Sequence, residues 1–220
     1  MNILASVTQG PSQAGLRIVI AGQEKMGKTT LCAGAPAPLL VPLEVGFAGV
    51  SIPRTPILTE WWQSIQFVNE VVNAVVAGNF PYRTIIFDSV TGLERHIHDD
   101  VIKRDPAYRN AGKKMLTMES THGGYGKAYP LANADFDQFL TACDFIAAAG
   151  VNVVMTAHVF SNKVMDPTAG EYDAWDLLLH SPKNSKTYGK RERLTQWADI
   201  IGFLYEPVFV SESGKMQKAV

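Results

Sequence analysis

The hydrophobic and polar positions divide the chain into short apolar runs that alternate with segments of helical spacing. Residues 16–21, 83–90 and 151–159 are rich in Val and Ile, and each run predicts a buried strand. Residues 39–46 form a further apolar run, which Pro42 interrupts. These runs are the expected strands of a central sheet.

Apolar residues recur at helical spacing in residues 59–77, 91–104 and 132–149, and each of these segments predicts a helix. A shorter helix is expected to begin within residues 27–34, where "GAPAP" terminates it. Strands that alternate with helices predict βαβ units, and strands that are apolar throughout predict a parallel sheet covered on both faces. We therefore expect an α/β fold with a mainly parallel central sheet flanked by helices.

Two polar stretches are expected to be irregular loops, namely residues 105–130 and the basic region that follows residue 159. A last pair of strands is expected near "ADIIGFLYEPVFV". We divide the chain into an N-terminal lead, residues 1–15, a core, residues 16–210, and the start of a further segment, residues 211–220.

Composition agrees with one globular domain. The chain has 220 residues, of which 46% are hydrophobic and 19% charged, enough for one substantial core. No apolar run approaches the roughly 20 residues of a membrane span, and the N-terminus lacks the pattern of a signal peptide, so we expect a cytoplasmic protein without a membrane partner. The two cysteines, Cys32 and Cys143, are far apart and predict neither a disulfide framework nor a zinc site.

The segment "GQEKMGKT" fits the phosphate-binding pattern G-x-x-x-x-G-K-[ST] and lies between a predicted strand and a predicted helix, the context that this loop requires. Its backbone amides are expected to surround the β-phosphate of ATP, with Lys28 bridging the β- and γ-phosphates and Thr29 binding Mg²⁺. The expected nucleotide-binding residues are Gly22, Gln23, Glu24, Lys25, Met26, Gly27, Lys28, Thr29 and Thr30.

Three polar side chains lie toward the carboxyl ends of other predicted strands. Asp88 ends an apolar strand in the manner of a Walker B aspartate, which holds a magnesium-bound water, so Thr29 and Asp88 form the expected metal site. Ser89 follows it, at a position where many additional-strand P-loop ATPases carry a catalytic glutamate. Glu44 is therefore the candidate base, and His158 the candidate sensor of the γ-phosphate, which gives Lys28, Glu44 and His158 as the catalytic set. Since ligands of parallel sheets bind beyond the carboxyl ends of the strands, these residues are expected to form one site.

Basic residues gather in two segments although the net charge is only −1. Of the 20 Lys and Arg residues, eleven fall in these segments, which allows one positive face on a nearly neutral protein. The eleven are Lys103, Arg104, Arg109, Lys113, Lys114, Lys127, Lys183, Lys186, Lys190, Arg191 and Arg193.

The order of the P-loop, Glu44, Asp88-Ser89 and a polar sensor strand resembles the RecA-type recombinase core. More closely, "GQEKMGKTTL", "LEVG", "TIIFDSVTGLE", "GGYGKAY" and "VVMTAH" resemble the phage-encoded RecA-like ATPases linked to single-strand annealing, over about residues 16–205. The resemblance implies a homo-oligomeric ring or short filament with ATP at subunit interfaces and single-stranded DNA along its axis. It also implies a phage protein in a bacterial host cell, and a single-strand-binding protein is a possible partner.

In such proteins, two loops face the DNA, and they correspond here to residues 105–130 and 161–190. The candidate DNA-binding residues are Arg109, Lys113, Lys114, Tyr125 and Lys127, because cations neutralise phosphates and aromatic rings stack on bases. Three lysines could instead reach the γ-phosphate of a neighbouring subunit: Lys183, Lys186 and Lys190. The sequence does not separate these two roles.

Two other functions remain open. A small-molecule or nucleotide kinase shares the P-loop, although residues 105–130 offer only Arg109 for the arginine-rich lid that such enzymes need. An ATP-gated DNA-binding scaffold with little hydrolysis also fits, because Glu44 is the single candidate base. An AAA+ motor would need a helical lid with a sensor arginine after the core, and too little chain is expected to remain for one.

Overall fold

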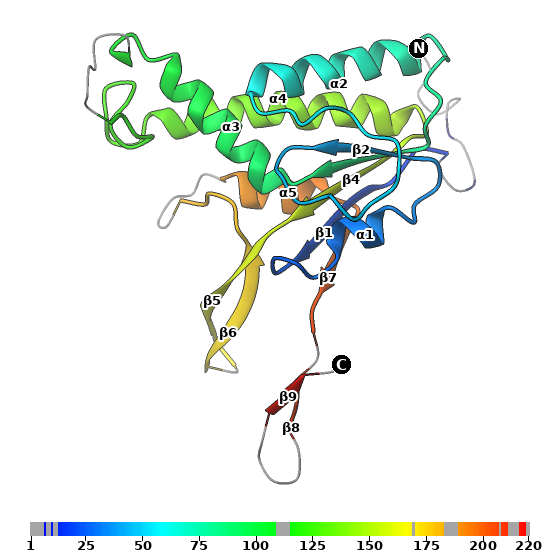
Figure 1. Ribbon diagram of the computed structural model, residues 1–220. Coiled ribbons are helices and arrows are strands. Elements are labelled where there is room, and N and C mark those ends of the chain that lie inside the picture. Colours follow the sequence, from blue (N-terminus) through cyan, green and yellow to red (C-terminus); the bar gives the residue numbers. More distant parts are fainter. Residues whose placement is uncertain are drawn as a thin grey trace.

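A computed structural model of the protein describes residues 7, 10, 13–108, 115–168, 170–182, 189–206, 208–210 and 216–218. The centre is a parallel sheet of five strands in the spatial order β2-β3-β4-β1-β7 (Figure 1). In this order the strands are β2 (Pro38–Pro42), β3 (Thr84–Asp88), β4 (Asn152–Ala157), β1 (Arg17–Gly22) and β7 (Ile200–Leu204). The predicted mainly parallel α/β fold is confirmed.

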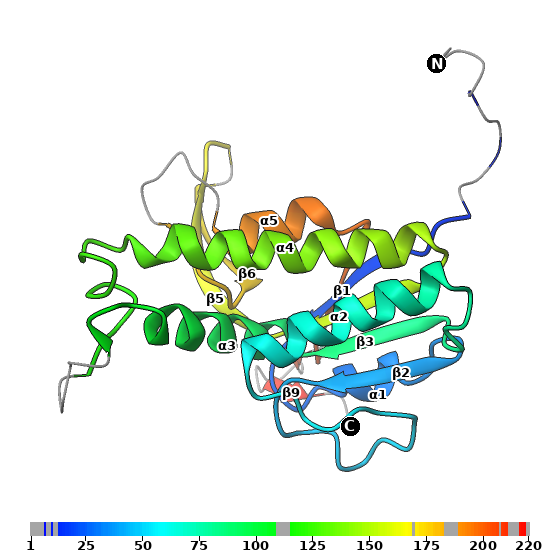
Figure 2. The ribbon, with the colours of Figure 1, turned by 90° about the horizontal axis from the view of Figure 1, so that it is seen from above.

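Helices cover both faces of this sheet. One face carries three long helices, α2 (Trp61–Val76), α3 (Val90–Lys103) and α4 (Ala128–Ala148), and the short α5 (Lys190–Trp197) beside α4 (Figure 2). The other face carries α1 (Lys28–Cys32), whose Cys32 packs with Leu40, Ile86 and Val154. Both cysteines are buried free thiols.

The main core lies between the sheet and the three long helices. Phe87 of β3 meets Phe139 of α4 with ring centroids 5.0 Å apart and Phe67 of α2 at 6.1 Å. Each fully buried side chain of this size contributes about 2–3 kcal/mol through loss of apolar surface from water. This packing fixes the ends of the strands, and with them the positions of the polar residues that follow.

The start of helix α4 differs from the sequence expectation. Helix α4 begins at Ala128 rather than at residue 132, two residues after Gly126, which has a φ of 70°. The expected loop of residues 105–130 is therefore shorter.

The second expected loop, the region after residue 159, is wrong over most of its length. Residues 159–177 form an antiparallel hairpin of β5 (Val159–Asp166) and β6 (Gly170–Leu177). Its residues are mostly exposed or half-buried, so the hairpin shows no apolar run in the sequence.

The expected last strand pair is also partly wrong. Strand β7 pairs with β1 inside the main sheet, whereas β8 (Val208–Val210) pairs with β9 (Met216–Lys218). An apolar run does not specify its neighbour, because pairing depends on residues far away in the sequence. Among the helices of the described residues, none combines the length and the apolar character needed to cross a membrane.

Candidate functional site

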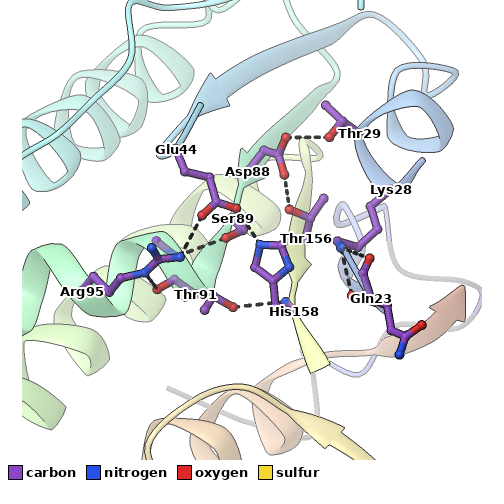
Figure 3. A network of polar contacts seen from close by, with 12 residues as sticks. Gln23, Lys28, Thr29, Glu44, Asp88, Ser89, Thr91, Arg95, Thr156 and His158 are labelled. Carbon is purple, nitrogen blue, oxygen red and sulfur yellow. Dashed lines mark hydrogen bonds and ion pairs between the residues drawn. The ribbon is translucent and has the colours of Figure 1, made fainter. Parts of the chain in front are cut away.

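The carboxyl ends of four strands bring the predicted residues together (Figure 3). Lys28 follows β1, Glu44 follows β2, Asp88 ends β3 and His158 follows β4. Strand β4 lies between β1 and β3, so a further strand separates the phosphate loop from Asp88. The sequence prediction that these side chains share one edge of the sheet agrees with this geometry.

The P-loop turns tightly between β1 and α1. Gly27 has a φ of 81° and Lys25 a φ of 62°, so both residues lie in the left-handed region of backbone conformation. This region favours glycine, which is the residue at position 27. Gly22 is required for another reason. A Cβ at Gly22 would lie 2.8 Å from the carbonyl oxygen of Leu204, because β7 passes close beside it.

Lys28 is buried, with 6% of its surface exposed, and its Nζ donates to the carbonyl oxygens of Gly22 at 2.9 Å and Gln23 at 2.7 Å. Burial lowers the pKa of Lys28, although the charges of Asp88 and Glu44 oppose the shift. An ammonium in such surroundings is strongly attracted to an incoming anion. Lys28 is therefore placed to bind phosphate.

Thr29 and Asp88 face each other, as expected of a metal site. The Thr29 hydroxyl donates to Asp88 Oδ2 at 2.7 Å, and the buried Thr156 hydroxyl donates to Asp88 Oδ1. A carboxylate and a hydroxyl fit Mg²⁺, which keeps several waters and takes further oxygens from phosphates. Within the described residues no group of three or more His, Cys, Asp or Glu side chains forms an all-protein metal cage. The donor set thus fits Mg²⁺ bound together with a nucleotide.

Glu44 is held by hydrogen bonds from neighbouring side chains. Its Oε1 accepts from His158 Nε2 at 2.8 Å, and its Oε2 accepts from Arg95 at 2.9 Å. Burial raises the pKa of Glu44, but hydrogen bonds from His158 and Ser89 and the charges of His158 and Arg95 outweigh it, and the net pKa is lowered. Glu44 is therefore a carboxylate at neutral pH, the state that a general base requires.

Helix α3 positions this pair. Ser89 caps it by accepting from Gly92 N at 3.1 Å, and the peptide bond between Asp88 and Ser89 is cis. Thr91 Oγ1 accepts from His158 N at 3.1 Å, and Arg95 lies one turn later on the same helix. Ser89 thus has a structural role, at the position where many additional-strand P-loop ATPases carry a catalytic glutamate.

Three residues of the site were not predicted, namely Thr91, Arg95 and Thr156. Thr156 could have been found from the sequence, since it is a polar residue inside an otherwise apolar strand. Thr91 and Arg95 could not have been found from the sequence, because their contacts with His158 and Glu44 depend on how α3 packs against the sheet.

Two of the five candidate DNA-binding residues, Tyr125 and Lys127, are among the described residues, in the segment that leads into α4. Tyr125 is 97% exposed and has a φ of 56°, and it follows two glycines with positive φ. Lys127 is the residue before α4. Arg109, Lys113 and Lys114 lie outside the described residues.

The expected role of Lys190 in a neighbouring subunit is wrong. Lys190 is completely buried, and its Nζ lies 2.9 Å from His98 Nε2 and 3.6 Å from Glu94 Oε1. An ammonium inside the protein between α3 and α5 does not reach a second molecule. The other two candidates, Lys183 and Lys186, lie outside the described residues.

Comparison with known proteins identifies a family. The sequence profile of a family described as "AAA domain" matches residues 14–218. No curated relative matches the sequence. Among solved structures, 114 chains match, and one is the crystal structure of the RadB recombinase, with a TM-score of 0.45 and 13% identity over 91% of this chain and 79% of that chain.

The AAA name is shared with the AAA+ motors, for which a helical lid after the core was expected to be missing. After Leu204, the described residues form strands β8 and β9.

Proposed function

Because the chain belongs to the AAA-domain family, we propose that it binds ATP with Mg²⁺ at the strand ends of Figure 3 and hydrolyses it while acting on single-stranded DNA in recombination. The action on DNA would be annealing or strand exchange. The observation that carries the proposal is the convergence of Lys28, the Thr29–Asp88 pair and the Glu44–His158 pair at one edge of the sheet.

Each group has a task that follows from its chemistry. Backbone amides of the P-loop and the Lys28 ammonium bind the phosphates, and the lysine exchanges its two carbonyl acceptors for phosphate oxygens. Thr29 and Asp88 would hold Mg²⁺, which supplies neutralisation of phosphate charge. Thr156 fixes the orientation of the Asp88 carboxylate.

Hydrolysis requires a base beside the γ-phosphate. Glu44 is ionised and lies at the tip of β2, and it takes the proton of the attacking water once its hydrogen-bond partners release an oxygen. His158 joins Glu44 to the hairpin β5–β6, because β5 begins at Val159. Loss of the γ-phosphate is in this way communicated to the hairpin.

The proposed DNA contacts are Tyr125 and Lys127 at the end of the loop before α4, with Arg109, Lys113 and Lys114 in the same sequence segment. Exposure of Tyr125 supports this assignment, since a ring that stacks on bases must be accessible. We further propose a homo-oligomer, a ring or short filament, in the cytoplasm of a phage-infected bacterium, working beside a single-strand-binding protein.

A second candidate, the ATP-gated scaffold with little hydrolysis, is favoured by one observation. Both carboxylate oxygens of Glu44 are engaged, Oε1 by His158 and Oε2 by Arg95. A base held in this manner acts only after it is released, so turnover without DNA is expected to be slow.

The test is the rate of ATP hydrolysis with and without single-stranded DNA. We expect DNA to increase turnover, and nucleosides and sugars to have no effect. Lys28→Ala is the control, since it should abolish ATP binding. Phosphorylation of a nucleoside or sugar would identify a kinase, and nucleotide-dependent DNA binding without turnover would identify the scaffold. Retained ATP affinity in Lys28→Ala would contradict the assignment of the P-loop.

A further inference from the structure

The hairpin β5–β6 is joined to helix α3 at both of its ends. At the first end, the backbone N–H of His158, the residue before β5, donates to Thr91 Oγ1 at 3.1 Å. At the second end, the backbone N–H of His180, three residues after β6, donates to both carboxylate oxygens of Glu94, at 2.9 and 3.1 Å. The two ends are also bonded to each other, since Leu178 N donates to the carbonyl oxygen of His158 at 2.8 Å.

The two acceptors lie on one face of α3. Thr91 and Glu94 are three positions apart, which makes them neighbours on the surface of a helix. Arg95, four positions after Thr91, donates to Glu44 Oε2 at 2.9 Å, and His158 Nε2 lies 2.8 Å from Glu44 Oε1 (Figure 3). The helix face that holds the hairpin therefore also holds the candidate base.

Both acceptors are shielded from water. Thr91 is 5% exposed and Glu94 is 8% exposed. Lys190 Nζ, 3.6 Å from Glu94 Oε1, keeps the carboxylate charged and in place. A buried N–H that loses its acceptor costs about 1–3 kcal/mol, so neither end of the hairpin separates from α3 without a penalty.

The rest of the hairpin has fewer attachments. Asp176 pairs with Arg191 of α5, and the Trp175 ring stacks on Phe203 of β7, so both of these contacts are made near the end of β6. Most of the other side chains of the hairpin are exposed or half-buried, and its tip projects from the molecule (Figure 1). The position of the hairpin is therefore decided where its strands meet the body of the protein.

We propose that Thr91 and Glu94 are positioning residues, which hold both ends of the hairpin against the helix that carries Arg95, so that the hairpin and the Glu44–His158 pair move together. The inference rests on the proposed function, in which His158 senses the γ-phosphate. A γ-phosphate that contacts His158 restrains the first end of the hairpin directly, and it restrains the second end through the backbone bond between the ends and through α3. The hairpin therefore distinguishes a bound nucleoside triphosphate from a diphosphate.

The experiment is hydrogen–deuterium exchange of residues 159–177 in the full chain with Mg²⁺ and either ADP or ATPγS, a slowly hydrolysed analogue of ATP. We expect ATPγS to slow the exchange of these amides by about fivefold or more relative to ADP, the lower end of typical coupling between two sites. Thr91→Val removes the acceptor at the first end and should reduce this difference to less than about twofold. Thr91→Ser keeps the hydroxyl and should keep the difference.

The second end needs a matched pair of variants, because Glu94 is charged. Lys190→Met combined with Glu94→Gln and Lys190→Met combined with Glu94→Leu both remove the buried ion pair. They differ in the acceptor that remains for the His180 N–H, so the glutamine variant should keep the effect of ATPγS and the leucine variant should lose it. The control for a general loss of stability is Ile97→Val, which removes a methylene from the core on α3 and should keep the effect.

Other outcomes overturn the inference. Equal exchange with ADP and with ATPγS in the wild type, while both nucleotides bind, shows that the hairpin does not follow the site. A full effect of ATPγS in Thr91→Val or in the leucine variant shows that the acceptor in question is not needed, and a lost effect in Ile97→Val assigns the response to stability alone. Equal binding of ATPγS by the wild type and by Lys28→Ala would instead refute the P-loop site, and the proposed function would fail together with this inference.

Discussion

Glu44 Oε1 lies 2.8 Å from His158 Nε2, and the hydrogen bond that His158 donates joins the ends of β2 and β4 across the end of β3. The two residues are 114 positions apart in the chain. Arg95 holds the second oxygen of the same carboxylate, so the candidate base is ionised and held in place at the strand ends.

Replacing Glu44 by Gln should remove turnover and retain ATP binding. The amide keeps the size of the side chain but accepts no proton from water, and loss of a general base lowers kcat by about 100-fold or more. Steady-state hydrolysis and equilibrium binding of ATP measure the two effects. The control is Glu70→Gln, which changes an exposed carboxylate on α2. Turnover equal to that of the wild type would place the base elsewhere.

Replacing Arg95 by Met should move the acidic limb of the pH profile of kcat. Arg95 helps to lower the pKa of Glu44, so its removal raises that pKa, and the carboxylate becomes protonated at higher pH than in the wild type. Since the Arg95 side chain is 64% exposed, solvent screens the pair and the limb should shift by less than about one pH unit. A limb that stays in place or moves to lower pH would contradict the role of Glu44 as the titrating base.

Replacing Thr156 by Val should raise the Mg²⁺ concentration needed for half-maximal activity. Thr156 is completely buried and donates to Asp88 Oδ1, so valine leaves this oxygen without its donor and frees the carboxylate to rotate. The folded state should lose about 1–3 kcal/mol, which urea unfolding measures. Thr156→Ser keeps the hydroxyl and should behave as the wild type. An unaltered Mg²⁺ requirement in the valine variant would show that Asp88 needs no such support.

The buried pair of Lys190 and Glu94 should dominate the stability of the α3–α5 contact. Burial raises the pKa of Glu94 and lowers the pKa of Lys190 to about 8, so each charge depends on the other. Lys190→Met should lower the free energy of unfolding by about 3 kcal/mol or more, because it leaves the buried Glu94 carboxylate without the Lys190 cation, and the His180 N–H that also donates to it carries no full charge. Glu94→Gln in the same chain should restore most of the loss.

The control for this pair is Lys163→Met, which breaks the ion pair of Lys163 with Glu171 on the exposed hairpin. With side chains 70% and 51% exposed, that pair should contribute less than about 1 kcal/mol. Equal effects of the two lysine substitutions on urea unfolding would show that burial adds nothing to the Lys190 pair.

Most of the sheet could be predicted from local patterns in the sequence. Apolar runs of four to eight residues are typical of strands in a sheet that is covered on both faces, and the spacing of Gly22, Gly27 and Lys28 is that of a phosphate loop whatever the rest of the chain does. Asp88 was predictable because a polar residue that ends a buried strand must lie at the edge of the sheet.

The hairpin and Lys190 were missed for opposite reasons. Residues 159–177 pair with one another and stay partly exposed, so they lack the apolar runs that indicate a core strand. Lys190 lies in a basic segment whose composition is typical of a surface loop. In the structure it is the first residue of helix α5 and is buried against Glu94 and His98. A lysine side chain is identical in the two settings, and only its neighbours decide which one it occupies.

The sequence by itself determined the parallel α/β class, the P-loop and the set of polar residues that end the strands, because these features arise from periodicity and spacing within a few residues. The tertiary structure alone decided that β4 lies between β1 and β3 and that His158 meets Glu44. These relationships depend on which strands become neighbours, and that choice is made by the packing of the whole core, in which contacts between distant residues are summed.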